Sequence, residues 1–231
     1  MKKLISLFFI SLLFVLISGC SKTENSTGEL TTAGISSISG KLEGWSHGTG
    51  KTIVMGQYNG PNSIDVIGSG SIGSDGSFTI NLLAAPMEFL LDSLTSGDFD
   101  CSGKMTSSVA GVMVYGTGGA LILNGGNFFG YAQCVSRDWR AERLYIPQLN
   151  DDIMELVYFS KATTVGGSQT CPQSFDDSTE VRVTRNVSDL QVTAGWNKVF
   201  DKVSARTDST CTFNLGKTDP GTLKWYYKTV N

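Results

Sequence analysis

The sequence has few histidine and proline residues and no excess of positive charge. Its 231 residues include one histidine and five prolines, and 18 basic residues face 21 acidic ones, so the formal net charge is −3 at pH 7. A protein that binds nucleic acid needs a cationic surface to neutralise phosphates. The charge balance therefore excludes nucleic acid as an expected partner.

The single histidine restricts the hydrolytic chemistry that the chain can support. Residues 44–48, GWSHG, match the G-x-S-x-G pattern of a nucleophile elbow. In that motif the serine takes its acid and its histidine from later in the chain. Here the only histidine is His47, next to Ser46, and no helix pattern follows. We therefore expect no serine hydrolase here, and the sequence assigns no catalytic residue.

The same stretch ends like a phosphate-binding loop. Gly50-Lys51-Thr52 matches the end of G-x-x-x-x-G-K-[ST], but the residue five before Gly50 is Trp45 instead of glycine. The following Ile53-Val54-Met55 is strand sequence, whereas a phosphate loop opens a helix. We interpret the stretch as a glycine-rich hairpin loop between the first two strands, with Trp45 covering one end of a sandwich.

Closely spaced cysteines are also lacking. Apart from Cys20 the chain has Cys101, Cys134, Cys171 and Cys211. With no two of them close together and one histidine, the spacing of a zinc site is absent, so neither a metal nor a cofactor is expected. An even number of cysteines in an oxidising compartment predicts two disulfides, with three possible pairings. We favour Cys101 with Cys134 and Cys171 with Cys211, because each pair would join neighbouring segments of one domain.

The chain has one long apolar run, at its N-terminus. Met1-Lys2-Lys3 precedes residues 4–17, which are apolar apart from two serines, a pattern typical of a secretory signal peptide. The run is shorter than the roughly 20 residues that a helix needs to cross a bilayer. No other stretch is long and apolar enough to span.

The run ends in Ile17-Ser18-Gly19-Cys20, which resembles the lipobox of bacterial lipoproteins. The resemblance implies that residues 1–19 are removed and that Cys20 carries a thioether-linked diacylglycerol and an amide-linked acyl chain such as palmitate. These chains would anchor the protein to the membrane at about 0.8 kcal/mol per buried CH₂. Ser21, which is not aspartate, implies passage to the outer membrane, and the remaining chain has 16 basic and 21 acidic residues, a net charge of −5.

Residues 20–34 are polar and without periodicity, so after the lipidated cysteine we expect a flexible tether. Beyond it, abundant glycine, serine, threonine and valine predict a mainly β protein of one or two antiparallel β-sandwich modules, at 35–95 and 96–231. Strands are expected at 38–45, 52–59, 63–72, 77–82, 109–115, 120–123, 128–134, 153–160, 179–185, 190–193, 196–203 and 223–230. A short helix is expected over 86–94 from the spacing of Met87, Leu90, Leu91 and Leu94 after Pro86, and a long connection over 136–152.

Two segments resemble known groups of proteins. The motif GSDGSFTINL at 73–82, with the strands before it, resembles transthyretin-like or carboxypeptidase-regulatory-like β-sandwich modules over about residues 36–84. That resemblance implies a non-catalytic module. The stretches LVYFSKATTVGG, DLQVTAGWNKV and LKWYYK are similar to segments of uncharacterised bacterial lipoproteins over roughly 153–230, and no activity follows from that resemblance.

Acidic residues suggest two further kinds of site. Asp98, Asp100 and Ser102 followed by Gly103 imitate the start of a calcium loop, but Val109 stands where a bidentate glutamate is required, which favours a polar turn. The adjacent pairs Asp151-Asp152 and Asp176-Asp177 could support glycoside hydrolysis. Because neighbours in sequence usually point apart, we interpret both pairs as solvated loop charges.

Aromatic residues are the more promising candidates for binding. Trp225, Tyr226 and Trp196 lie in strand-like segments near the C-terminus, and alternation along Trp225-Tyr226-Tyr227 turns at least one large ring away from the core. An exposed ring could stack on a sugar or fill a partner's pocket. The alternative is that Trp225 and Tyr227 are core residues and that Tyr226 lies against a neighbouring loop.

From the sequence we expect a non-catalytic cell-envelope lipoprotein that binds or scaffolds an envelope component, an envelope protein or an extracellular polysaccharide. The alternatives are a carbohydrate-active enzyme that uses paired carboxylates and a structural assembly subunit. Two carboxyl groups in a cleft, roughly 5 to 10 Å apart, would favour the enzyme. An uncovered edge strand would favour the assembly subunit, because unpaired edges recruit partner strands.

Overall fold

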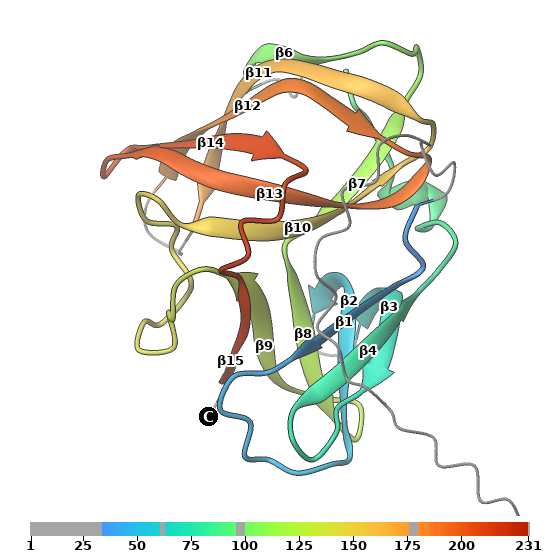
Figure 1. Ribbon diagram of the computed structural model, residues 1–231, viewed down its shortest axis with the longest axis vertical. Coiled ribbons are helices and arrows are strands. Elements are labelled where there is room, and N and C mark those ends of the chain that lie inside the picture. The colour runs from blue at the N-terminus through green and yellow to red at the C-terminus, as the bar shows by residue number, and fades with distance from the viewer. Residues whose placement is uncertain (1–33, 61–62, 96–99, 176–179, 231) are drawn as a thin grey trace, which may run out of the picture. The chain divides into compact units, whose positions relative to one another are not determined.

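The computed structural model describes residues 34–60, 63–95, 100–175 and 180–230 (Figure 1). These residues are mainly β, as the sequence predicts, and residues 31–231 form one compact unit. The predicted signal peptide, Cys20 and most of the predicted tether lie outside the described residues. In the part of the chain that is described, no helix has the length and apolar character needed to cross a membrane.

Seven strands enclose the first core in a small barrel. In spatial order they are β1 (Ser37–Lys41), β4 (Ser77–Leu82), β3 (Ser63–Ser71), β2 (Lys51–Gly60), β8 (Gly119–Asn124), β9 (Asn127–Val135) and β15 (Lys224–Thr229). Leu42, directly after β1, bridges in parallel to Trp225 of β15 and so returns to the start of the ring. The strand β4 has the bounds that its alternation predicts, because Phe78 and Ile80 face the core while Ser77, Thr79 and Asn81 are exposed.

The remaining strands form a second, strongly curved part of the sheet, seen above the barrel in Figure 1. Its order is β7 (Met113–Thr117), β10 (Asp152–Phe159), β13 (Gly195–Arg206), β14 (Thr210–Gly216), β12 (Glu180–Val192), β11 (Thr163–Ser174) and β6 (Ser102–Ser107), with β5 (Asp92–Ser93) beside β7. We call this part the curved sheet. All of its neighbouring pairs are antiparallel except β12 and β14, which run parallel.

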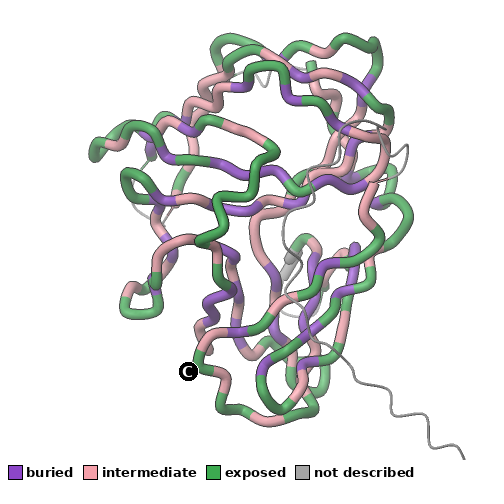
Figure 2. Tube along the Cα trace, viewed as in Figure 1, coloured by how far each residue is buried: buried purple, intermediate pink, exposed green. Residues whose placement is uncertain are grey.

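The strands β10 and β13 belong to both cores. On one face Met154, Leu156 and Phe200 pack into the barrel core, and on the other Val199 and Phe159 pack inside the curved sheet. Successive side chains of a strand point to opposite faces, so a strand between two cores must be apolar on both. Figure 2 shows buried segments in both strands among intermediate and exposed ones, and consecutive residues are buried at 153–154 of β10 and at 199–201 of β13.

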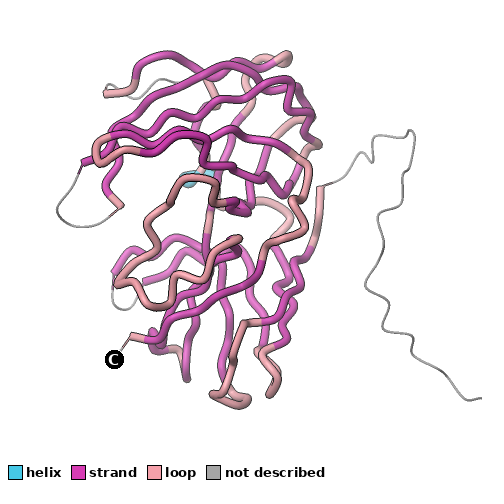
Figure 3. The backbone as a smooth tube through the Cα atoms, turned by 60° about the vertical axis from the view of Figure 1, so that its left-hand side comes forward, coloured by secondary structure: helices cyan, strands magenta, loops and turns pink. Residues whose placement is uncertain are grey.

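Several sequence predictions are wrong in detail. The loop before β2 is not a hairpin, because β1 pairs with β4 and not with β2. The helix expected over 86–94 shrinks to the 3-10 turn η1 (Glu88–Leu90), the short cyan segment in Figure 3. Phe89 is 71% exposed and only Leu90 of this turn is buried, so the segment lacks the buried apolar face that would stabilise a longer helix. The connection over 136–151 is confirmed as a long loop.

The predicted disulfide pairing is also wrong. Cys101 is bonded to Cys171, whereas Cys134 and Cys211 are free, buried thiols. The bond joins the start of β6 to β11, which lie side by side over Ser102 and Thr170. Cys134 faces the barrel core and Cys211 the core of the curved sheet, so the fold separates these two cysteines.

The two expected modules, 35–95 and 96–231, share one sheet. Strand β2 of the first pairs with β8 of the second through Ile53 and Ile122, among other residues. The last strand, β15, returns to the barrel that β1 begins. Neither predicted segment therefore has a hydrogen-bonded sheet of its own.

Candidate binding cavity

The curved sheet lines a partly open cavity of about 300 Å³. Its walls are mostly apolar side chains from seven strands: Met105, Val114, Val157, Phe159, Val165, Val187, Leu190, Val199 and Leu215. Asp92, Ser93 and Leu94 line the same cavity from the segment around β5. Ligand sites in proteins are typically concave, about 300–1,000 Å³ in volume and largely apolar, with a few polar groups that orient the ligand.

Strand alternation and one bulge create this lining. In β12, Val183, Arg185 and Val187 face inward at every second residue. The left-handed backbone of Asp189, with φ of 50°, then adds one residue, so that Leu190 also faces inward. A bulge of this kind changes which face the following residues occupy. Without the extra residue Leu190 would face outward, and the apolar inward-facing positions of β12 would end at Val187.

Three charged side chains lie among the apolar residues inside the curved sheet. Glu155 of β10 and Arg185 of β12 line the large cavity and also a smaller one of about 130 Å³, which Gln133 and Tyr145 line as well. Asp201 of β13 points to the same face as Val199. We call Glu155, Arg185 and Asp201 the polar layer, because it separates the two apolar clusters inside the curved sheet.

Asp201 is the least hydrated member of the polar layer. It is 1% exposed, with Ile153 and Leu215 as its neighbours on the adjacent strands. Its Oδ1 atom accepts no hydrogen bond from the described residues. Burial raises the pKa of Asp201 well above its usual range, the nearby charge of Glu155 raises it further, and Arg185 opposes the shift. A buried carboxyl that lacks a partner is favoured in its neutral form.

The side chain of Arg185 packs against an aromatic ring. Its guanidinium carbon lies 5.6 Å from the centre of the Phe213 ring, a cation–π contact between neighbouring residues of β12 and β14. Among the described residues Arg185 forms no ion pair. Its planar set of N–H donors therefore borders both cavities without a carboxylate bound to it.

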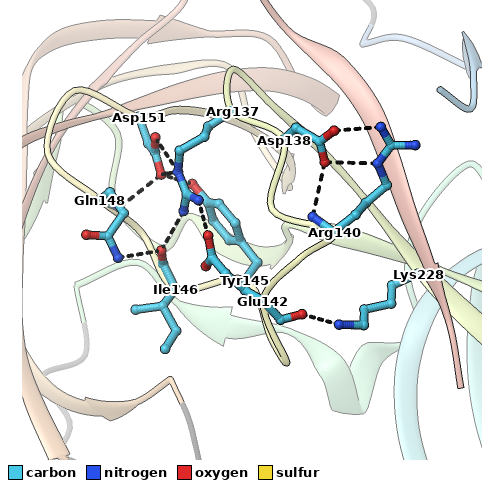
Figure 4. Close-up of polar contacts among 9 residues, drawn as sticks. All are labelled: Arg137, Asp138, Arg140, Glu142, Tyr145, Ile146, Gln148, Asp151 and Lys228. Carbon is cyan, nitrogen blue, oxygen red and sulfur yellow. Dashed lines mark hydrogen bonds and ion pairs between the residues drawn. The ribbon is translucent and has the colours of Figure 1, made fainter. Parts of the chain in front are cut away.

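The acidic residues that the sequence suggests for hydrolysis have structural partners (Figure 4). Asp151 accepts hydrogen bonds from Nε of Arg137 at 3.2 Å, the Tyr145 hydroxyl at 2.9 Å and the Gln148 backbone at 2.9 Å. Asp152 lies 3.7 Å from Lys202. The other pair, Asp176 and Asp177, lies outside the described residues. In Asp151 every oxygen is engaged in holding the loop over 136–151.

The three aromatic residues expected to stack on a ligand are buried, which corrects that prediction. Trp225 is 6% exposed, Tyr226 9% and Trp196 2%. Trp225 packs edge-on against Phe78 in the barrel core, and Tyr226 lies beneath Arg140 of the long loop. The core interpretation of the Trp-Tyr-Tyr run is thus the correct one, since these strands are covered on both faces.

The stretch 44–52 forms an aromatic corner of the barrel. His47 meets Trp45 edge-on at 5.1 Å and Phe129 at 5.0 Å, and Nε1 of Trp45 donates to the Gly48 carbonyl at 2.8 Å. Among the described residues Ser46 has no general base placed as in a serine hydrolase, because its neighbour His47 packs against aromatic rings. Within the described ranges no group of three histidine, cysteine or acidic residues could hold a metal ion.

Sequence reasoning missed the polar layer, although a signal for it exists. Glu155 and Asp201 stand at inward positions of strand patterns that are otherwise apolar, in DIMELVYF and GWNKVFDKV. An acidic residue at such a position is rare unless it is paired or functional. Which strands bring Glu155, Arg185 and Asp201 together follows only from the sheet order.

Comparison with known proteins adds no assignment: no family model, curated protein or solved structure matches this chain.

Proposed function

We propose that the protein is a lipoprotein of the bacterial cell envelope, anchored in the outer membrane through Cys20, that binds a small apolar or amphipathic envelope component inside the curved sheet. The observation that carries the binding proposal is the cavity of about 300 Å³ with mostly apolar walls. Its volume is at the lower end of the range for ligand sites. The anchor is supported by the lipobox-like residues 17–20.

Binding in the cavity is favoured over binding of a polysaccharide at the surface. Trp196, Trp225 and Tyr226 are buried and offer little ring surface for stacking on sugars. Hydrolysis by Asp151 and Asp152 is disfavoured because Asp151 is bound by three donors and Asp152 faces Lys202. A mostly apolar interior suits a ligand whose larger part is hydrocarbon, since burial of that surface drives association.

Fluorescence titration with N-phenyl-1-naphthylamine, an uncharged apolar probe, tests the proposal. Gly116 of β7 lies opposite Val157 and borders the cavity, and a Cβ atom there would have one neighbour, Val157, at 3.9 Å. Gly116→Leu therefore extends a side chain into the cavity without a clash. We expect saturable binding of one probe per wild-type chain and at least tenfold weaker binding to the variant.

Gly216→Leu is the matched control. Gly216 of β14 pairs with Phe200, on the sheet face opposite the cavity, and a Cβ atom there meets nothing within 4 Å. This variant should bind the probe as the wild type does. If the wild-type chain binds no probe, or if both leucine variants bind equally well, the cavity is not the binding site.

A further inference from the structure

Resting on this proposed function, we infer that the cavity takes a single-chain amphiphile with an uncharged, hydroxylated head group, such as an acylglycerol or alkyl glycoside. The head group is recognised by Glu155 and Arg185, which line both cavities, and by Asp201, which lies close enough to interact with both charges, while the hydrocarbon chain fills the large cavity.

Two buried oxygen atoms beside the cavities accept no hydrogen bond from the described residues. They are Oδ1 of Asp201 and Oε1 of Gln133. Gln133 lines the small cavity together with Glu155 and Arg185. Buried polar atoms nearly always have a partner, and an unsatisfied one costs free energy. Acceptors that lack a donor call for a ligand that supplies hydrogen atoms.

The position of the polar layer defines where the head group lies. Glu155 and Arg185 border both cavities, so the head group sits where the large and small cavities meet. A Cβ atom on Gly118 would lie 3.6 Å from Oε1 of Glu155, which directs this carboxyl group towards the small cavity. On the other side of the polar layer the lining is hydrocarbon from Val157, Val199 and Leu215.

The charges of the polar layer decide the class of head group. A carboxylate or phosphate would bind Arg185 but would face the negative charge of Glu155. An ammonium group would bind Glu155 but would face the positive charge of Arg185. A hydroxyl group both donates and accepts, so it can serve Glu155, Asp201 and Gln133 as donor and Arg185 as acceptor without repulsion.

Calorimetric titration of the full chain with three ligands of equal chain length tests the head group. The ligands are glycerol monooctanoate, octanoate and octylamine, each below its micellar concentration. We expect glycerol monooctanoate to bind at least tenfold more tightly than the other two. Equal or tighter binding of octanoate or octylamine would overturn the assignment of an uncharged head group.

The variant Asp201→Leu tests recognition of the head group separately from binding of an apolar ligand in the cavity. It removes the carboxyl group and keeps the branched shape of the side chain, so the affinity for glycerol monooctanoate should fall about tenfold while that for N-phenyl-1-naphthylamine stays unchanged. Glu155→Gln is the second variant in case Asp201→Leu does not fold, with the same expectation. Asp152→Asn, which alters the contact with Lys202, is the control and should change neither affinity.

The outcomes distinguish the two proposals. Loss of glycerol monooctanoate binding with the naphthylamine retained supports the head-group inference. If both variants bind glycerol monooctanoate as tightly as the wild type, Asp201 and Glu155 serve buried water and the head-group inference is wrong. If the wild-type chain binds neither the naphthylamine nor any octyl ligand, the proposed function itself fails.

Discussion

At the residue scale, Asp201 is the side chain that departs furthest from what a stable core prefers. It lies between Ile153 and Leu215, almost without solvent contact, where a leucine of the same branched shape would leave no unsatisfied oxygen. Replacing a buried polar group by an apolar one of the same shape is often neutral or stabilising. A residue kept against stability is a natural candidate for a binding role.

The first prediction concerns the pH dependence of stability. The pKa of Asp201 is raised above its usual 3.8 in the folded chain, so above that value the folded state holds a proton that the unfolded chain has released. The free energy of unfolding therefore falls as pH rises from about 4 to the raised pKa, and this contribution is flat beyond it.

Urea titrations of the wild type and Asp201→Asn from about pH 4 to about pH 8 measure this contribution. The difference in unfolding free energy between the two proteins should move steadily in favour of the variant as pH rises. Other groups titrate alike in both proteins, so their contributions cancel in the difference. Asp75 is one such group, and hydrogen bonds from Ser77 lower its pKa. A difference that does not change with pH would show that Asp201 ionises normally.

The second prediction concerns the free thiols. Burial raises the pKa of Cys134 to about 12 and also raises that of Cys211, and only a thiolate attacks an alkylating reagent. Iodoacetamide at about pH 8 should leave both residues unlabelled in the native protein and label both in urea without a reductant. Peptide mass spectrometry gives the readout. Failure to label them in urea would mean that they are disulfide-bonded after all.

At the element scale, the long loop over 136–151 is held by charge as well as by Trp139 and Tyr145, which pack into an apolar cluster of the curved sheet. Asp151 accepts hydrogen bonds from Arg137, Tyr145 and Gln148. Arg137 also donates hydrogen bonds to Glu142 and to the Ile146 carbonyl (Figure 4). Tyr145 lines the small cavity, so the loop forms part of its wall. Because a buried carboxylate with several donors is costly to lose, this loop should depend strongly on Asp151.

The third prediction follows from that arrangement. Asp151→Ala leaves the Arg137 charge half-buried and the Tyr145 hydroxyl without its acceptor, and should lower the free energy of unfolding by about 2–4 kcal/mol. Asp138→Ala removes the more exposed pair with Arg140 and should cost about 0–1 kcal/mol. Urea denaturation of both variants measures the contrast. Equal losses would contradict the role given to Asp151.

Local alternation predicts many of the strands but not their neighbours. The pattern at 77–82 predicts β4 with its true bounds, whereas its partner β1 comes from a segment about forty residues earlier. Strands β6, β11 and β14 escape prediction because serine, threonine and glycine obscure their alternation, as at Gly166-Gly167 of β11. The polar layer could not be read from the sequence for another reason: it depends on the order of β10, β13, β14 and β12 in the sheet.

At the scale of the whole molecule, two cores share the wall formed by β10 and β13. Trp196 and Phe200 close the barrel from one face of β13, and Val199 closes the curved sheet from the other. The barrel core borders a cavity of about 380 Å³, lined by Ile38, Phe200 and Trp225 among others. The cavity of the curved sheet differs from it in having Glu155 and Arg185 among mostly apolar side chains.

The fourth prediction concerns the anchor. If Cys20 carries the acyl chains, Cys20→Ala abolishes lipidation, and the protein should move from the membrane fraction to the soluble fraction. Incorporation of labelled palmitate and fractionation measure the two effects. Ser21→Ala, which preserves the cysteine, is the control and should remain lipidated. A Cys20→Ala protein that stays firmly in the membrane fraction would contradict the anchor.

The most direct test of binding in the curved sheet is methyl NMR of the wild-type chain, labelled at leucine, valine and methionine, during titration with 1-octanol. We predict saturable shifts confined to methyl groups that line the cavity, among them Met105, Leu190 and Leu215, with Leu83 and Met87 on the surface unchanged. Shifts restricted to the exposed methyl groups, or no saturable shifts at all, would contradict a binding cavity inside the curved sheet.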